Sequence, residues 1–288
     1  MILRKALILA ALTLTTASAI AQKTNTPADS GMLKGPAIAQ LEKIAQIDVP
    51  AGYIFVDGKG TRELMESKGE PTSGKEVGLL FSTNENWSVF FDYADEGYIK
   101  DDDKDKLDPK KLLASIKRGN DEANKQRVRS GNPPLQIVGW EVMPKYDSAT
   151  HNLEWAIRAT SGGRPLLNYN TRLLGRKGVM RVVLVVDPEN LQETLPVFRN
   201  LLVGYSFNPG ETYAEYRSGD KVAKYGLAAL VVGGAAVGAA KLGLLGSLAI
   251  FIKKAWKVIV LGIAAIAASL KKIIGRIFGK KSGSEPFH

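Results

Sequence analysis

Clustered apolar residues along the middle of the chain predict a β-sheet. Residues 77–82 and 87–94 are rich in aromatic and β-branched side chains and flank a polar turn, which is typical of a β-hairpin. A further strand is expected at residues 53–56. Four later apolar runs follow one another at close spacing and therefore indicate an antiparallel meander: residues 135–143, 151–160, 166–174 and 179–186.

Helices are expected where capping residues precede apolar side chains at helical spacing. Asp108 followed by Pro109 predicts a helix start, with aspartate as the cap and proline in the first turn, and this helix should reach residue 129. The other expected elements are a short helix at 36–47, a helix at 61–68 capped by Thr61, a helix opened by Asp187 and Pro188 that carries apolar side chains at 191–202, and a short last strand at 204–207.

These elements predict an α+β fold in which one antiparallel sheet is covered by helices. The closing order of long strands, helix and short edge strand resembles the Mog1/PsbP-like arrangement, and the resemblance implies that topology for the C-terminal half. The 288 residues leave room for one domain of ordinary size, which we place at residues 36–216, and for accessory segments at both ends.

Residues 1–21 have the three regions of a secretory signal peptide: a basic start, an apolar run and a stretch of small residues. Ala19 and Ala21 form the small-x-small cleavage motif. The apolar run is shorter than the roughly 20 residues that a spanning helix needs. We therefore expect cleavage after Ala21, a flexible polar leader at 22–35 and export of the domain that follows.

The formal charge of +10 is concentrated at the C-terminal end. Residues 217–288 hold 12 Lys and Arg against 2 Asp and Glu, whereas residues 22–216 hold 25 against 27. The exported domain is thus slightly acidic and has no basic face for a phosphate backbone, which excludes nucleic acid as a partner. The chain has no cysteine, which excludes disulfides and thiolate chemistry.

The C-terminal region combines long apolar runs with lysines, a pattern typical of membrane segments. Residues 225–246 are expected to form a transmembrane helix in which Lys241 reaches an interface by snorkelling, while Gly234 and Gly238 form a small-xxx-small pair for close helix packing. Residues 247–281 form a basic apolar segment that is either interfacial or a second membrane helix, and 282–288 form a tail. The anchoring side chains of this segment are Lys253, Lys254, Trp256 and Lys257.

This layout predicts a bacterial membrane protein, placed at the inner membrane, whose residues 22–216 are periplasmic. The cations that follow the first span would then face the cytoplasm, in accord with the positive-inside rule. Membrane lipid is therefore an expected partner, and the membrane helices offer a route to an oligomer. The alternative for both apolar segments is a buried helical hairpin of a soluble protein.

The exported domain offers few candidates for a chemical site. Asp101, Asp103 and Asp105 imitate the first ligands of a calcium loop, but the glycine and the closing glutamate of an EF-hand are missing, which favours a solvated acidic turn. His151 has carboxylates near it in sequence, yet no spacing implies an activated nucleophile or paired carboxylates. We retain these four residues as surface-site candidates and expect no catalytic residue, cofactor or metal.

Two further patterns have competing interpretations. Residues 69–76 fill a phosphate-loop template except at Glu76, where a carboxylate replaces the hydroxyl that should bind magnesium, so a turn without nucleotide is expected. Trp87, Trp140 and Trp155 lie in predicted strands, where aromatic side chains usually belong to the core; a sugar-stacking platform is the alternative.

Five runs of the chain resemble a bacterial family with a domain of unknown function: residues 52–61, 97–105, 146–155, 168–175 and 213–222. The similarity covers nearly the whole mature chain. The resemblance implies a membrane-anchored protein and an association with the regulation of amylopullulanase. It implies no activity and no catalytic residues.

The leading hypothesis is a non-enzymatic, membrane-anchored envelope protein whose exported domain recognises a protein or the envelope matrix. One alternative is that the membrane region is the working part and assembles a complex or pore through Gly234 and Gly238. Another is a hydrolase of envelope polysaccharide, which would need two carboxyl groups about 5 to 10 Å apart in one cleft.

Overall fold

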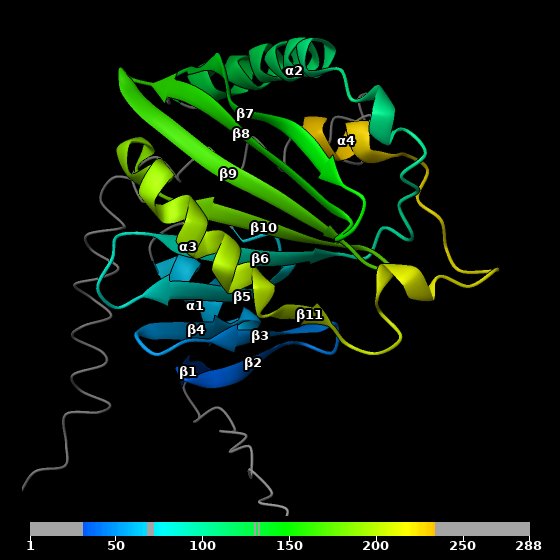
Figure 1. The fold of residues 1–288 in the computed structure, drawn as a ribbon. Coiled ribbons are helices and arrows are strands. Elements are labelled where there is room, and N and C mark those ends of the chain that lie inside the picture. The colour runs from blue at the N-terminus through cyan, green and yellow to red at the C-terminus, as the bar shows by residue number, and fades with distance from the viewer. Residues whose placement is uncertain (1–30, 68–71, 130, 132, 234–288) are drawn as a thin grey trace, which may run out of the picture.

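A computed structural model describes residues 31–67, 72–129, 131 and 133–233, and its described part contains two antiparallel sheets (Figure 1). The large sheet has eight strands in the order β1-β4-β5-β6-β10-β9-β8-β7, and the small one has three in the order β11-β3-β2. The large sheet consists of β1 (Met32–Lys34), β4 (Tyr53–Asp57), β5 (Glu76–Ser82), β6 (Ser88–Ala94), β7 (Leu135–Asp147), β8 (Asn152–Ser161), β9 (Arg164–Leu174) and β10 (Val179–Val185). The small sheet consists of β2 (Ala37–Leu41), β3 (Ala45–Val49) and β11 (Tyr205–Phe207). The α-helices are α1 (Gly58–Ser67), α2 (Pro109–Arg129), α3 (Leu191–Val203) and α4 (Leu227–Val232), and the short 3-10 helices are η1 (Lys104–Lys106), η2 (Pro188–Asn190) and η3 (Tyr213–Glu215).

The α+β fold expected from the sequence is confirmed, because helices pack on a large antiparallel sheet. The hairpin of β5 and β6 and the meander from β7 to β10 occur where the apolar runs predicted them. Neighbouring strands of the meander pair over most of their length, with β8 and β9 in register from Asn152 opposite Leu173 to Ser161 opposite Arg164. Short polar turns thus join strands that are adjacent both in sequence and in space.

The helix expected at 36–47 is wrong, because these residues form β2, a turn and β3. Their buried side chains are Ala39, Leu41, Ala45, Ile47 and Val49, which alternate with more exposed residues at the period of two that strands require. Glu42 lies in the turn at a φ of 55°. Strand β3 also pairs with β11, which is distant in sequence, so packing decides the conformation of this ambiguous apolar run.

One face of the large sheet is closed by α3 and the small sheet. Figure 1 shows α3 crossing in front of the long strands, with β11, β3 and β2 lying below it. Phe198 of α3 and Leu41 of β2 are fully buried, and they belong to the same apolar cluster as Phe91 of β6, Tyr169 of β9 and Met180 of β10. This cluster is the main core of the described chain.

The opposite face is covered in two separate places. Helix α1 packs on β4 and β5 above a small cluster that contains Ile54 and Leu79. Helices α2 and α4 enclose a second cluster near β7 and β8 that contains Leu153 and Trp155. Strands β6, β10 and β9 lie between these two coverings, and several of their side chains on this face are only half-buried.

The predicted start of α2 is confirmed, whereas the predicted cap of α1 is wrong. Asp108 Oδ1 accepts a hydrogen bond from the Lys111 backbone N–H at 3.0 Å, and Pro109 is the first helical residue. In α1 the carboxylate of Asp57 accepts from the Gly60 N–H at 2.7 Å, while Thr61 lies inside the helix, fully buried, and donates to the Asp57 carbonyl at 2.7 Å. The helix therefore begins three residues earlier than expected, at Gly58.

Both ends of the domain differ from the expected boundaries at 36 and 216. Strand β1 lies in the segment expected as a flexible leader and pairs with β4, from Met32 opposite Val56 to Lys34 opposite Ile54. Helix α4 lies in the segment expected to begin the membrane span, and its Leu227 is fully buried in the domain. Among the residues that the structure describes, no helix is long and apolar enough to cross a membrane.

Strand β7 forms one edge of the large sheet and is irregular along its length. Its pairing with β8 shifts register between Ile137 and Gly139, between Trp140 and Val142, and between Val142 and Lys145. Pro144 lies in the last of these irregular stretches and has no backbone N–H to offer to another strand. These features interrupt the row of backbone groups that an edge strand exposes.

Replacing Phe198 by alanine should destabilise the domain strongly. The side chain is fully buried between α3 and the sheet, and truncation of a buried phenylalanine costs about 3–5 kcal/mol of unfolding free energy. Urea denaturation followed by circular dichroism measures this change. Val203→Ala on the same helix, where the side chain is 82% exposed, should shift the unfolding free energy by less than about 0.5 kcal/mol, and an equal loss in both variants would refute the assigned core.

Candidate functional site

The chain after β11 crosses one end of the large sheet as an irregular segment that contains η3, residues 208–226, which we term the C-terminal strap. Thr212 forms a β-bridge with Gly175, and the Arg176 N–H donates to the Glu211 carbonyl at 2.8 Å. Farther along, Val222 forms a parallel bridge with Tyr98, whose N–H donates to the Lys221 carbonyl at 2.8 Å. Backbone hydrogen bonds thus tie the strap to the turn between β9 and β10 and to the loop after β6.

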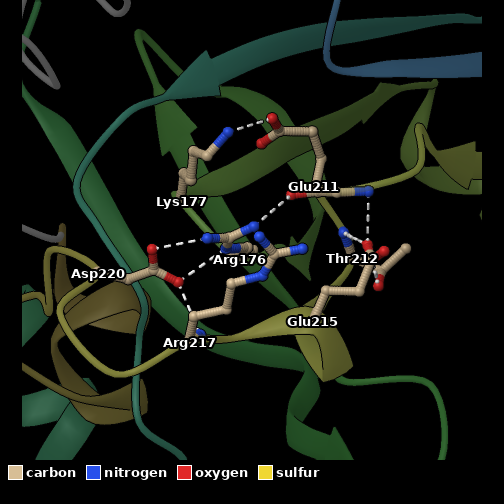
Figure 2. A network of polar contacts seen from close by, with 8 residues as sticks. Arg176, Lys177, Glu211, Thr212, Glu215, Arg217 and Asp220 are labelled. Atoms are coloured by element: carbon tan, nitrogen blue, oxygen red, sulfur yellow. Dashed lines mark hydrogen bonds and ion pairs between the residues drawn. The ribbon is translucent and has the colours of Figure 1, made fainter.

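A bidentate ion pair fastens the middle of the strap (Figure 2). Arg176, in the turn between β9 and β10, donates from Nε and Nη2 to the two carboxylate oxygens of Asp220 at 2.7 and 2.8 Å. The Arg217 backbone N–H also donates to Asp220, at 2.7 Å. These bonds to the charged form lower the pKa of Asp220 to about 2, with the Arg176 side chain as the largest cause.

Glu215 closes a turn at the beginning of the strap by accepting hydrogen bonds from strap residues. Its Oε2 accepts from the backbone N–H groups of Gly210 and Thr212, at 2.8 and 3.0 Å, and from the Thr212 hydroxyl at 2.7 Å. Together with Thr212 it forms the capping box of η3. The bonds from Thr212 lower the pKa of Glu215 below its usual value, so the carboxylate stays charged and keeps this turn closed.

The strap leads directly into α4, which Asp103 caps. The two carboxylate oxygens of Asp103 accept from the Leu227 and Ala228 N–H groups at 3.0 and 3.1 Å. A side chain at Gly226, just before the helix, would displace this cap, because a Cβ at this position would stand 2.7 Å from the Asp103 carboxylate. The apolar side chains of α4 then pack into the cluster that contains Trp155.

Four aromatic rings form a stack beneath the strap. His151 lies 4.1 Å from Tyr213, Tyr213 lies 4.4 Å from Tyr98, and Tyr98 lies 4.3 Å from Tyr216, measured between ring centroids. The Tyr213 hydroxyl donates to the Ile99 carbonyl at 2.8 Å. The stack joins the start of β8, the loop after β6 and the strap, so these three segments form one rigid corner.

The Tyr146 hydroxyl connects two of the candidates found in the sequence. It donates to Asp101 Oδ2 at 3.1 Å and lies 3.0 Å from His151 Nδ1. Burial, followed by the charge of Asp101, raises the pKa of Tyr146, so the phenol stays protonated. With one ring nitrogen held by Tyr146 and its ring stacked on Tyr213, His151 is fixed as a structural bridge between segments.

The four surface-site candidates therefore have different surroundings. Asp101 and His151 meet at Tyr146, Asp103 caps α4, and Asp105 lies exposed in η1. In the described part of the chain no group of three or more His, Cys, Asp or Glu side chains is arranged to hold a metal ion.

The remaining residues singled out in the sequence lie outside the described residues. For the signal cleavage site these are Ala19 and Ala21, and for the membrane region they are Gly234, Gly238, Lys241, Lys253, Lys254, Trp256 and Lys257. Their roles stay predictions.

The three tryptophans do not form one platform for a sugar. Trp87 is buried in the main core on one side of the large sheet, whereas Trp155 is buried in the α2–α4 cluster on the other side. Trp140 packs against this second cluster and donates from Nε1 to the Pro109 carbonyl at 3.0 Å. The core interpretation of these side chains is therefore the correct one.

Sequence reasoning missed Tyr146, the tyrosines of the stack and the ion pair of the strap. Tyr98, Tyr146 and Tyr213 come from three distant parts of the chain, and Arg176 and Asp220 are separated by 44 residues. No local spacing signals such contacts. The turn glycines at 175 and 178 are the one local hint, since a tight turn between two strands is a common place for an anchoring side chain.

Comparison with known proteins identifies one family. A family described as "Protein of unknown function (DUF2167)" matches residues 34–264. Among solved structures, the solution structure of cyanobacterial PsbP (CyanoP) from Synechocystis sp. PCC 6803 is similar, with 12% identity, coverage of 62% of this chain and 94% of that chain, and a TM-score of 0.38. No curated protein matches the chain.

Asp103→Ala should loosen α4, because the Leu227 and Ala228 N–H groups lose their acceptors. Loss of such a cap costs about 1 kcal/mol, so these two amides should exchange with solvent about fivefold faster. Hydrogen exchange followed by NMR or mass spectrometry reads this change. Asp105→Ala, in the neighbouring exposed position, should leave their exchange unaltered, and equal acceleration in both variants would contradict the capping role.

Asp220→Asn should make the thermal stability of the fold less dependent on pH in the acid range. The pKa of Asp220 is about 2 in the folded chain and near 3.8 ordinarily, so its ion pair stabilises the fold above about pH 4, and this contribution is lost as the pH falls toward 2. Thermal unfolding measured from pH 6 to pH 2 should therefore show a smaller drop in Tm for the variant. Asp95→Asn, which removes an exposed ion pair with Lys221, serves as the control and should keep the wild-type slope.

Proposed function

The chain belongs to the DUF2167 family, described as proteins of unknown function, and we propose that it is a non-enzymatic binding module of the bacterial envelope. In this proposal residues 1–21 direct export, the domain lies in the periplasm, and the apolar and basic C-terminal region holds it at the inner membrane. The proposal combines the signal-like N-terminus and the lysine-flanked apolar runs of the sequence with the way the domain ends.

The observation that carries the proposal is that the domain packs against the first residues of the apolar C-terminal region, with no free linker between them in the described chain. The strap is bonded to the sheet at Glu211, Asp220 and Lys221, and α4 follows at once. Leu227 at the start of the apolar run is already part of a domain cluster. Such an ending supports a domain seated close to its anchor, with its orientation set by packing.

We infer that the membrane tether starts after Gly233. Leu227, Leu230 and Val231 are buried against the domain and are not free to face lipid at the same time. Residues 234–252 would then supply the span, with Lys241 as their one charged residue, which matches the roughly 20 residues needed to cross a bilayer when Lys241 snorkels outward. The lysines that follow would face the cytoplasm.

The chemistry of the domain favours binding over catalysis. The contacts of His151 are with Tyr146 and Tyr213, which hold three segments together. Glu76 and Asp92 are cross-strand neighbours, but they are 1% and 5% exposed, so a polysaccharide has no access to them. A hydrolase needs its carboxyl pair in an open cleft.

A truncation placed by the structure tests the tether. A chain that ends at Gly233 keeps Asp220, the strap and α4, so it should fold as the full chain does, whereas a cut at residue 217 would remove the partner of Arg176. We expect alkaline carbonate to leave the full chain in the membrane pellet and the chain ending at Gly233 to appear in the soluble periplasmic fraction. Release of the full chain by carbonate, or a truncated chain that stays in the pellet, would reject the tether.

A further inference from the structure

A row of charged side chains crosses the uncovered strip of the large sheet. Glu76 of β5 is paired with Asp92 of β6, Asp92 with Arg181 of β10, and Arg181 with Arg172 of β9. Directly paired residues point to the same side of a sheet, so these four side chains share one face. This is the face that carries α1 and α4, because Val179, two residues before Arg181, packs in the α2–α4 cluster.

The two arginines lie side by side, and the carboxylates of Asp92 and Glu96 act on Arg172 from nearby. The arginines are direct cross-strand neighbours, and like charges so placed repel each other. Arg181 approaches Asp92 only to 3.6 Å, and its Nε is buried without a hydrogen-bond partner in the described structure. Arg172 lies 4.6 Å over the Trp155 ring, and burial together with the charge of Arg181 lowers its pKa. Arg172 already donates from Nη1 to the Thr171 carbonyl at 3.1 Å and from Nη2 to Asn170 Oδ1 at 3.5 Å. Among the described contacts, the donor that lacks an acceptor is therefore the Arg181 Nε–H.

The two acids lie on one side of the arginines and are more deeply buried. Asp92 is 5% exposed and its Oδ1 has no hydrogen-bond partner in the described structure, while burial raises its pKa above the usual value. Glu76 is 1% exposed, and its Oε1 accepts from the Ser73 N–H and hydroxyl at 2.6 and 2.9 Å. Both carboxylates are thus held below the surface, whereas the Arg181 side chain is 30% exposed and faces the strip.

An apolar floor adjoins the arginines. The next row of paired residues on this face runs from Phe90 of β6 through Val183 of β10 to Asn170 of β9, and all three are half-buried. Neither α1 nor the α2–α4 pair closes over this row completely. Phe90 also packs against the cluster under α1, and the Asn170 side chain is engaged with Arg172 and the Asn168 carbonyl. The strip therefore offers guanidinium groups beside a partly covered apolar surface.

We propose that this strip of β6, β10 and β9 binds a small organic carboxylate, with its carboxylate on Arg172 and Arg181 and its apolar body on Phe90 and Val183. A carboxylate matches the planar fork of a guanidinium, and it would separate the two like charges while giving the buried Arg181 Nε an acceptor. The site gives a ligand class to the binding role proposed above and rests on that role, but it does not depend on the membrane tether.

The neighbouring acids favour a single negative charge on the ligand. A phosphate near neutral pH carries close to two charges, and both would be repelled by Glu76 and Asp92. A monocarboxylate carries one negative charge, so Glu76 and Asp92 repel it less.

The test uses the purified full chain in detergent, titrated with isovalerate at pH 7 and read by intrinsic tryptophan fluorescence. Trp155 lies beneath Arg172, so occupation of the site should change its emission in a saturable way. Isovaleramide, which has the same apolar body without the charge, should produce no saturable change. Inorganic phosphate should bind more weakly than isovalerate.

Matched variants localise the site. Arg172→Gln and Arg181→Gln should each weaken isovalerate binding by about tenfold or more, and Arg172→Lys should weaken it with the positive charge kept, because the bidentate fork is lost. Arg158→Gln, which removes an arginine that pairs with Glu141 on the opposite face of the sheet, should bind as the wild type does. Circular dichroism checks that each variant is folded.

The outcomes separate this proposal from the tether. No saturable response to isovalerate, equal binding of isovaleramide, tighter binding of phosphate or an equal loss in Arg158→Gln would each overturn the carboxylate site. The membrane fractionation of the chain ending at Gly233 is read independently of fluorescence, so failure of the tether leaves the ligand test intact. A carboxylate that binds with the predicted variant pattern supports the site whichever compartment the chain occupies.

Discussion

The bidentate pair of Arg176 and Asp220 determines how the chain passes from the large sheet to its C-terminal region. Arg176 is held in the tight turn between β9 and β10, so its guanidinium has a fixed position, and the planar fork meets both oxygens of the carboxylate. The side chains are 11% and 16% exposed, which shields the pair from much of the solvent screening that weakens surface ion pairs. The ring stack, the bridge of Val222 to Tyr98 and the docking of α4 all need the strap in this place.

The elements that local sequence predicts well are those with local causes. Asp108 and Pro109 start α2 because a cap and a first-turn proline act within a few residues, and the meander follows from alternation and short turns. Residues 36–47 were ambiguous because a short run of alanine, isoleucine and leucine suits either a helix or a strand. Pairing of β3 with β11 decides between them, and that partner lies at the other end of the domain.

The candidate site was predictable only in part for the same reason. Asp101 and His151 were recognised by residue type, and they do meet, but the group that joins them is the Tyr146 hydroxyl, which has no distinguishing motif. The charge row of Glu76, Asp92, Arg181 and Arg172 exists only through strand order and register. A sequence contains the four residues, yet a slip of one position in any strand would send its member to the other face.

The two faces of the large sheet therefore have different uses. The face under α3 and the small sheet is closed and apolar, and it supplies most of the burial on which stability depends. The other face keeps a strip between its coverings where charged side chains remain. Buried charges in such a position oppose folding unless they are paired and hydrogen-bonded, and here Asp92 and Arg181 form an ion pair while Arg181 Nε has no partner in the described structure.

The irregular pairing register of β7 affects how copies of the chain would meet if they were anchored in the same membrane. Proteins confined to a surface meet at high local density and with similar orientation, conditions that favour joining of sheets edge to edge. At β7 the bulges and Pro144 deprive an incoming strand of a regular ladder, while the edge at β1 is only three residues long. In the proposed membrane-anchored state, neighbouring copies would thus crowd together laterally and still remain separate molecules.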